Sequence, residues 1–167
     1  GIPADPLFRS AVVLDTVEGV AAGTLLRAEL ASEFIPARPL DIWLPSSYDG
    51  AQKHNVLYMY DAQMLFDATT TWNGQEWRVD EILDSLITDD VIAPTIVVAL
   101  YNGGQRRNFE YFPEKPAAQL QAAFSDSVLS EISKRYGSDS TFSVNSDNYL
   151  RYMIEEVKPF VDGQFAV

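Results

Sequence analysis

The chain has 167 residues, of which 47% are hydrophobic and 22% charged, so it can bury a sizeable core as one globular domain. Lys and Arg total 12 against 24 Asp and Glu, and the net charge of −12 disfavours nucleic acids and anionic membranes as partners. The lack of cysteine excludes disulfides, thiolate metal sites and a cysteine nucleophile, but it leaves the compartment open between periplasmic, secreted and cytoplasmic.

The first 22 residues predict an arm and a strand. Pro3 and Pro6 favour extended backbone in residues 1–8, and residues 10–17 form a weakly patterned strand candidate. No basic stretch followed by an apolar stretch opens the chain, so we expect that any signal peptide has been removed. No apolar run approaches the roughly 20 residues that span a bilayer.

Two strands after a turn at residues 19–23 predict an antiparallel hairpin. Residues 24–35 alternate imperfectly between apolar and polar side chains, which is typical of a long strand. A tight connection at residues 36–38 leads to the next strand, residues 40–44.

The apolar run Asn55–Tyr60 (NVLYMY) is the central feature of the sequence. A run of this length, ended by Asp61, is typical of a parallel strand that is buried on both faces. Ligands gather at the carboxyl ends of such strands. We therefore expect the loop at residues 61–74 to carry the chemistry.

A helix and a second buried strand follow this loop. Residues 75–88 predict the helix, with Asn73 and Glu76 as a capping box. The second apolar run, Thr95–Leu100, predicts a strand parallel to the first, joined to it by a right-handed crossover. The predicted fold class is α/β, a sheet with an antiparallel hairpin, parallel strands and flanking helices. The apolar face of the helix is expected to hold Val79, Ile82, Leu83 and Leu86.

Two long helices are predicted in the last third of the chain. Residues 117–136 form the first, which Gly137 ends. After a polar loop, Ser146 or Asp147 caps the second, which Pro159 disturbs near its end. The expected apolar faces are Leu120, Phe124, Val128 and Ile132 in the first, and Leu150, Met153, Ile154 and Val157 in the second.

Five sequence blocks occur in a specific order: VLYMYDAQMLFD, WNGQEWRVDEIL, TIVVAL, YNGGQRRNFEYFP and NYLRYMIEEVKPFVD. Together they resemble the putative-esterase family of α/β-hydrolases, which includes enterochelin esterases, feruloyl esterases, S-formylglutathione hydrolases and mycolyl-transferases. The resemblance covers residues 25–167 and is interrupted at residues 115–146, which we interpret as an insertion. It implies that residues 1–167 form a single, incomplete α/β-hydrolase domain.

The resemblance implies serine acyl transfer without a cofactor. A Ser on a GxSxG elbow attacks the ester, a His takes its proton, and an acid orients the His. Two backbone N–H groups hold the oxyanion, and the resemblance places one of them at Gln63, with Met64 as its neighbour. The family usually has Gly where this chain has Ala62. This departure bears on the oxyanion-hole assignment, because Gly eases close backbone approach.

The nucleophile elbow itself is absent from the sequence. Gly19 and Gly23 are its only glycines four positions apart, and Ala21 lies between them. The resemblance implies an elbow strand directly after the last predicted helix. We therefore expect the N-terminal part of a serine ester hydrolase, which is inactive by itself.

The resemblance makes Arg107, Glu110 and Tyr111 an R-x-x-E-Y element that recurs in the family, and it implies a place beside the acyl pocket for them. Arg107 either pairs with Glu110 to brace its loop or contacts the substrate directly. Trp72 and Trp77 either line the pocket or belong to the core. The candidate substrate-binding residues are Asp61, Ala62, Trp72, Arg107, Glu110 and Tyr111.

Few residues suit a metal site or a substitute base. His54, the sole histidine, begins its strand at the end opposite to the ligand loops, so we expect a solvated or locally capping role. Asp61 and Asp67 either hold a hard cation or, for Asp61, cap the N–H groups of the loop. We expect no metal site.

Two other functions stay open. The chain could be a non-catalytic carbohydrate-binding or docking module on a hydrolase-like scaffold, or one chain of a split esterase. A stand-alone module would protect Asn55–Tyr60 with charges or Pro, and neither is present. The expected partner is a small-molecule or carbohydrate ester, with self-association or a second chain at the open sheet edge.

Overall fold

The computed structural model describes residues 12–136 and 142–167, and its contacts divide the chain into two compact units. Within these residues, no helix combines the length and apolarity needed to cross a membrane. The arm predicted at residues 1–8 and the helix end at Gly137 lie outside the described residues. The first unit holds the described part of Gly1–Ala31 with Pro36–Tyr101 and Phe160–Val167, and the second holds Ser32–Ile35 and Asn102–Pro159.

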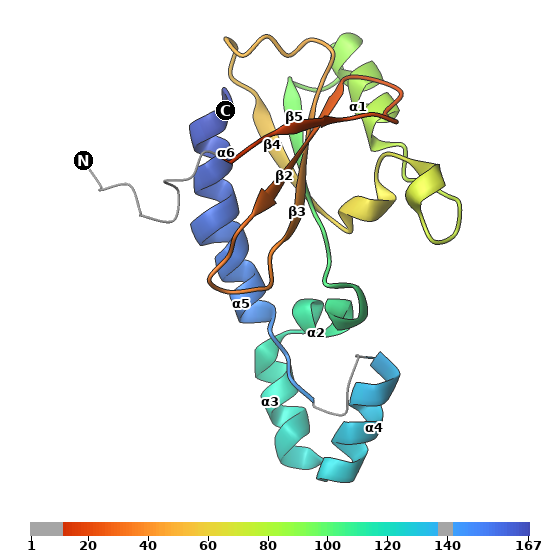
Figure 1. Ribbon diagram of the computed structural model, residues 1–167, viewed down its shortest axis with the longest axis vertical. Coiled ribbons are helices and arrows are strands. Elements are labelled where there is room, and N and C mark those ends of the chain that lie inside the picture. The colour runs from red at the N-terminus through yellow and green to blue at the C-terminus, as the bar shows by residue number, and fades with distance from the viewer. Residues whose placement is uncertain (1–11, 137–141) are drawn as a thin grey trace, which may run out of the picture. The chain divides into compact units, whose positions relative to one another are not determined.

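The first unit is built on a five-stranded sheet with the order β1-β2-β3-β5-β4 (Figure 1). The pairs β1–β2, β2–β3 and β3–β5 are antiparallel, and β4–β5 is parallel. The predicted hairpin, parallel pair and α/β class are therefore confirmed. The strands are β1 (Asp15–Val17), β2 (Thr24–Leu30), β3 (Arg38–Leu44), β4 (Asn55–Tyr60) and β5 (Thr95–Leu100).

The hairpin strand β2 ends five residues earlier than predicted. Its ladder with β3 stops at the pair Leu30↔Arg38. The Ser32 hydroxyl then accepts the N–H groups of Phe34 and Ile35 at 3.0 and 3.2 Å. Because this local turn captures backbone donors that a strand would use in its ladder, the strand cannot continue.

Strand β4 lies at the edge of the sheet. It pairs with β5 along its whole length and has no other strand neighbour among the described residues. The prediction that β4 is buried on both faces is wrong, since Leu57 and Tyr60 are each 40% exposed. Strand β5, which lies between β3 and β4, is buried from Ile96 to Leu100. Position in the sheet, which an apolar run does not encode, separates the two strands.

Helix α1 (Val79–Thr88) packs against one face of the sheet and begins four residues later than predicted. Arg78 has a left-handed backbone (φ 55°). A right-handed helix cannot continue through such a residue, so α1 begins only after it. Asn73 Oδ1 accepts the Gln75 N–H at 3.1 Å, so the predicted capping box is wrong. The core on this face comprises Leu25, Trp43, Ala62, Leu65, Phe66, Val79, Ile87, Val97 and Ala99.

One residue predicted for the buried face of α1 lies outside it. Ile82 is 51% exposed, whereas Val79 and Ile87 are buried and Leu83 packs against the core. At about 100° per residue, Ile82 lies about 100° from the centre of the face that these three residues share. The apolar spacing of the sequence fits two overlapping faces, and packing selects one.

The second unit is helical. Its elements are a 3₁₀ turn (Gly104–Arg106), α2 (Arg107–Tyr111), α3 (Glu114–Ala123), α4 (Asp126–Tyr136), α5 (Ser146–Arg151) and a π-helical segment (Tyr152–Val157); α6 (Lys158–Gln164) follows in the chain.

The single helix predicted at residues 117–136 is two helices. Phe124 has extended backbone (φ −115°, ψ 151°). The next residue, Ser125, precedes α4, and its carbonyl accepts the N–H of Leu129 at 3.0 Å. Serine is favoured at such a helix start. The break changes the phase of the pattern, so Phe124 and Val128 are 45% and 41% exposed rather than buried.

The last predicted helix starts and faces differently as well. Its N-cap is Asn145 rather than Ser146 or Asp147. Leu150 and Ile154 are 46% and 64% exposed, so their predicted burial is wrong; Tyr149, Tyr152 and Val157 are buried. The π-helical turn ends just before Pro159 and widens the helix where Pro lacks an N–H, so the predicted disturbance is confirmed.

Candidate active site

A tight turn follows the carboxyl end of β4. Asp61 has a left-handed backbone (φ 57°, ψ 47°), which turns the extended strand directly into the 3₁₀ turn Ala62–Met64. Ala62 and Leu65 are buried in the core, so the turn is anchored from below. The loop predicted to carry the chemistry therefore begins as a fixed element.

Hydrogen bonds distinguish the N–H groups of this turn. The Met64 N–H donates to the Asp61 carbonyl at 2.8 Å, and the Leu65 N–H donates to Ala62 at 3.2 Å. The N–H groups of Ala62 and Gln63 precede these bonds, so the turn does not use them. The carbonyl of Met64 in turn accepts the Trp77 N–H at 2.9 Å. The turn thus holds its shape while the Gln63 N–H stays outside its hydrogen bonds.

The Gln63 side chain lines a small polar cavity of about 100 Å³. Its Oε1 is buried and has no hydrogen-bond partner among the described residues. The other polar side chains of the cavity wall belong to strands and loops far apart in the sequence. They are Glu18, Arg27, Asp41, Asp67, Thr70 and Tyr101.

Arg27, Asp41 and Tyr101 form a closed network in this cavity. Arg27 donates from Nε and Nη2 to the two Asp41 oxygens at 2.7 Å each, and Nη2 also donates to the Tyr101 hydroxyl at 2.6 Å. That hydroxyl donates to Asp41 at 3.0 Å. Burial, together with the Asp41 charge, raises the pKa of Tyr101 well above its usual value, so the hydroxyl stays protonated.

Asp67 serves its own loop. Its Oδ1 accepts the N–H and the hydroxyl of Thr69 at 2.8 and 2.6 Å, and these bonds lower the pKa of Asp67. The Asp61 side chain does not cap the 3₁₀ turn that it precedes. Among the described residues, no three Asp, Glu or His side chains lie close enough together to hold a metal ion.

A buried carboxylate on α1 holds the turn at residues 19–23 through backbone N–H groups. Asp80 is fully buried, and its Oδ2 accepts the N–H groups of Ala21 and Ala22 at 2.7 and 3.3 Å. Burial raises the pKa of Asp80. Burial opposes ionisation of the neighbouring Glu81 as well, but its interactions with Asp80 and with Arg78 lower the pKa of Glu81.

His54 occupies the other end of β4. It is 6% exposed, so the expectation of a solvated side chain is wrong, although its side-chain contact with the Gln52 carbonyl is local. Its N–H donates to the Ala166 carbonyl at 2.9 Å, and Nδ1 lies 2.8 Å from the Gln52 carbonyl. Its ring lies 4.9 Å from that of Tyr48. These contacts join the start of β4 to the last residues of the first unit.

Trp72 is 86% exposed and Trp77 is 50% exposed, so neither belongs to the core. The tryptophan of the core is Trp43, whose Nε1 donates to the Ala22 carbonyl at 2.8 Å. Trp72 thus lies in the 61–74 loop with its indole open to solvent, which leaves substrate contact as a prediction.

The R-x-x-E-Y element lies in the second unit, on α2. Glu110 is 2% exposed, and its Oε2 accepts the Gly103 N–H at 2.8 Å, which braces the preceding loop. The Arg107 guanidinium lies 5.0 Å from the centre of the Tyr111 ring. Tyr111 also packs edge-on against Tyr149 at 5.5 Å. Glu110 thus braces the loop through Gly103, and the pairing of Arg107 with Glu110 stays a prediction.

Sequence reasoning missed the polar cavity beside Gln63. Arg27 and Asp41 are charged residues inside the strands TLLRAEL and RPLDIWL, and they form a directly opposed pair. Such charges, pointing to the same face as Leu25 and Trp43, could have indicated a paired polar site. Tyr101 gave no comparable signal, since it follows β5 as one aromatic residue among many.

Comparisons with known proteins agree with this architecture. A family described as Putative esterase matches residues 36–167. The ferulic acid esterase of Anaeromyces mucronatus, in a structure without substrate, is 16% identical to this chain. Its TM-score is 0.51 over 98% of this chain and 50% of that chain. Its complex with ferulic acid is 17% identical, with a TM-score of 0.50 over 91% of this chain and 47% of that one.

A feruloyl esterase module from Clostridium thermocellum, complexed with sinapinate, is 20% identical with a TM-score of 0.41 over 72% of this chain and 40% of that chain. No curated protein matches the sequence. The chain spans about half the length, or less, of the solved structures that it matches. At these identities the likeness to the fungal enzyme concerns the fold alone.

Proposed function

The chain belongs to the Putative esterase family, and on this premise we propose that it is the N-terminal part of a serine carboxylic-ester hydrolase. Its role is to supply one backbone N–H of the oxyanion hole and part of the acyl pocket. The nucleophile, the base and the acid come from a further segment, because no GxSxG is present here.

The proposal rests on the Gln63 N–H, which the hydrogen bonds of the turn do not use. Attack on an ester carbonyl places negative charge on its oxygen, and donors that are fixed in advance stabilise this charge. The Gln63 N–H follows the carboxyl end of β4 on a turn that is anchored through buried Ala62. The Met64 N–H already donates to Asp61, which favours Gln63 of the two candidates.

The open edge of β4 supports an additional strand. Leu57 and Tyr60 are partly exposed along a parallel edge that carries no Pro and no charged residue. Such an edge readily pairs with another strand. We assign this position to the strand that leads to the nucleophile elbow, from the continuing chain or from a second chain.

The proposed substrate is a carboxylic ester of a small-molecule or carbohydrate alcohol. Asp61, Ala62 and Trp72 belong to the loop of the oxyanion turn, and the exposed indole of Trp72 offers a flat apolar contact. Arg107, Glu110 and Tyr111 complete the proposed binding set. The enzymes crystallised with ferulic acid and sinapinate suggest aromatic acyl groups as the first esters to test.

The test compares two proteins: the 167-residue chain, and a longer chain translated from the coding DNA past Val167 to its stop codon, so that the Ser, the acid and the His are all included. We expect hydrolysis of p-nitrophenyl acetate and of methyl ferulate by the longer chain, and only background rates from the shorter one. Enzyme-like turnover by the 167-residue chain, or a coding sequence without GxSxG after Val167, would contradict the proposal.

A further inference from the structure

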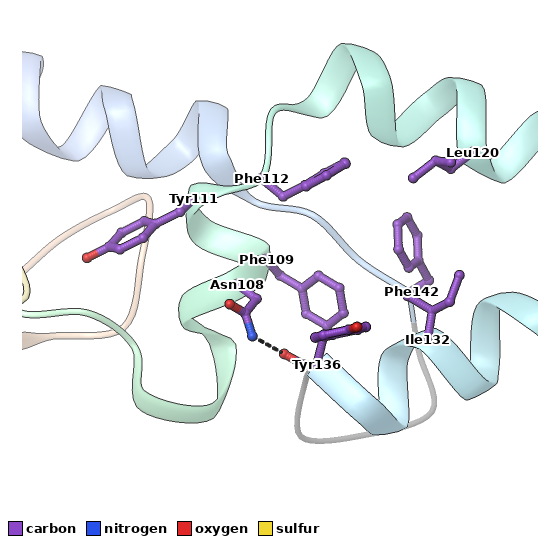
Figure 2. A pocket seen from close by; sticks show the side chains of 8 residues that line it. All are labelled: Asn108, Phe109, Tyr111, Phe112, Leu120, Ile132, Tyr136 and Phe142. Atoms are coloured by element: carbon purple, nitrogen blue, oxygen red, sulfur yellow. Dashed lines mark hydrogen bonds between the residues drawn. The ribbon is translucent and has the colours of Figure 1, made fainter. Parts of the chain in front are cut away.

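Helices α2, α3 and α4 of the second unit enclose a cavity of about 430 Å³ together with Phe142 (Figure 2). Phe109, at 4% exposed, forms its buried floor, and Phe112 and Tyr136, at 38% and 50% exposed, stand at its rim. Leu120 and Ile132 complete the apolar wall. None of these residues lines the cavity beside Gln63, and Tyr111 is the one described lining residue that also belongs to the proposed substrate-binding set.

We propose that this cavity is a binding site for a small, uncharged aromatic molecule. Its volume lies within the range of small-molecule pockets, roughly 300 to 1,000 Å³. Its walls come from three helices and close around a hollow, as the side chains in Figure 2 show, rather than forming one flat face. The proposal does not depend on ester hydrolysis.

The rings of the wall select an aromatic ligand. Phe109 and Phe142 meet edge to face, with ring centres 5.5 Å apart and planes at 77°. Figure 2 shows the Tyr136 ring on the same side of the hollow as these two. A ligand ring inserted among them finds both ring faces and ring edges, the two contacts that aromatic pairs prefer. A saturated molecule of equal size gains burial but not these contacts.

Charge selects a neutral ligand. No lining residue of the cavity among those described carries a charge; its polar side chains are Asn108, Tyr111 and Tyr136. Asn108 donates from Nδ2 to the Tyr136 carbonyl at 3.0 Å, which ties α2 to the end of α4 (Figure 2). A carboxylate would lose its hydration here without gaining a cationic partner in the wall. A phenolic or alcoholic hydroxyl, in contrast, suits the Asn108 amide and the Tyr136 hydroxyl. The Tyr111 hydroxyl points away from the other lining side chains (Figure 2).

The distribution of charge along the chain agrees with this choice. The second unit contains nine acidic and seven basic residues, whereas the rest of the chain contains 15 and five. Arg135 lies 5.7 Å from the centre of the Tyr136 ring and does not line the cavity. The near-neutral unit therefore presents an apolar, uncharged recess.

The test uses the purified 167-residue chain and three probes that share one carbon skeleton: 2-naphthol, its saturated analogue decahydro-2-naphthol, and 2-naphthoate. Binding is measured by isothermal titration calorimetry, with saturation-transfer NMR to locate the bound face of each probe. We expect 2-naphthol to bind at least tenfold more tightly than the saturated alcohol or the anion. No binding of 2-naphthol, or equal binding of the three probes, would overturn the proposal.

Variants locate the site. Ile132→Trp fills the cavity and is expected to weaken 2-naphthol binding at least tenfold. Val128→Trp is the matched control, because Val128 lies one turn earlier on α4, is 41% exposed and does not line the cavity; we expect a change of less than twofold. Equal effects of the two variants would place the binding elsewhere.

A second variant guards against misfolding of Ile132→Trp, which circular dichroism would reveal. Phe142→Leu keeps the wall apolar but removes one ring of the edge-to-face pair. We expect it to bring the affinities for 2-naphthol and decahydro-2-naphthol to within about threefold of each other. An unchanged preference for 2-naphthol in this variant would contradict the role of the rings.

Discussion

The Met64 N–H donates to the Asp61 carbonyl at 2.8 Å, and this single bond separates two adjacent oxyanion-hole candidates. It fixes the turn and occupies one donor, while the Gln63 N–H remains outside the turn's hydrogen bonds. Only a substitution that deletes a backbone N–H can test which donor acts.

Gln63→Pro removes that N–H, whereas Gln63→Ala keeps it and removes only the side chain. In the longer chain carrying a GxSxG, we expect Gln63→Pro to lower kcat by about 10² to 10³ and Gln63→Ala to lower it less than tenfold. Ester hydrolysis is measured beside thermal unfolding, because Pro also restricts Ala62. Equal losses in two folded variants would remove Gln63 from the oxyanion hole.

Asp41 holds two partners that a substitution would leave unsatisfied. The Arg27 guanidinium is 40% exposed, so water compensates part of its loss, but the Asp41 side chain is buried. We expect Asp41→Asn to lower the free energy of unfolding by about 1–3 kcal/mol in urea denaturation. The control is Glu81→Gln at the more exposed Arg78 pair, corrected for its contact with Asp80. An unchanged free energy of unfolding in Asp41→Asn would show that the network does not stabilise the fold.

Asp80 makes stability depend on pH in a defined direction. Because burial raises the pKa of Asp80 in the folded state, the folded chain binds more protons than the unfolded chain above the ordinary Asp value. This contribution is complete below about pH 4 and is lost as the pH rises through the raised pKa. Asp80→Asn mimics the protonated side chain and keeps an oxygen for Ala21 and Ala22.

We therefore expect the stability of the wild-type chain, relative to Asp80→Asn, to decrease between pH 4 and pH 7 in denaturant titrations. Asp89→Asn, an exposed position on the same segment, is the control and should leave the profile unchanged. A wild-type profile parallel to that of Asp80→Asn would contradict a raised pKa of Asp80 in the folded chain.

Two glycines test the loop before α2. A Cβ at Gly103 would clash with the Glu110 carboxylate, which is buried and accepts the Gly103 N–H. Gly103→Ala should lower the free energy of unfolding by about 1–3 kcal/mol through loss of that bond. Gly163→Ala, in α6 with open space around it, should raise it by about 0.5–1 kcal/mol. Thermal unfolding of both variants checks the opposite signs.

The edge of β4 predicts self-association of the 167-residue chain. Leu57→Lys introduces a charge at a 40% exposed edge position and should reduce association with little change in stability. Ile82→Lys, 51% exposed on α1, is the control and should leave association unchanged. Sedimentation velocity over a concentration series distinguishes them; a wild-type chain that stays monomeric throughout would argue against a reactive edge.

The sequence by itself determined the positions of β4 and β5, the hairpin and the family. The predicted strands Asn55–Tyr60 and Thr95–Leu100 coincide with β4 and β5, and the hairpin pairs as predicted. Strands can be predicted in this way because their apolar pattern extends over a few adjacent residues. The ordered blocks indicated a family that the match over residues 36–167 confirms. The roles assigned to Gln63 and Arg107 remain predictions.

Tertiary structure alone decided which apolar residues are buried and which polar ones meet. Leu57 is 40% exposed on the edge strand β4, which has one strand neighbour within residues 12–136 and 142–167, and an apolar run does not encode that position in the sheet. Arg27, Asp41 and Tyr101 form one network although 74 residues separate the first from the last. Local periodicity encodes local backbone, whereas these contacts depend on the sheet order that brings distant segments together.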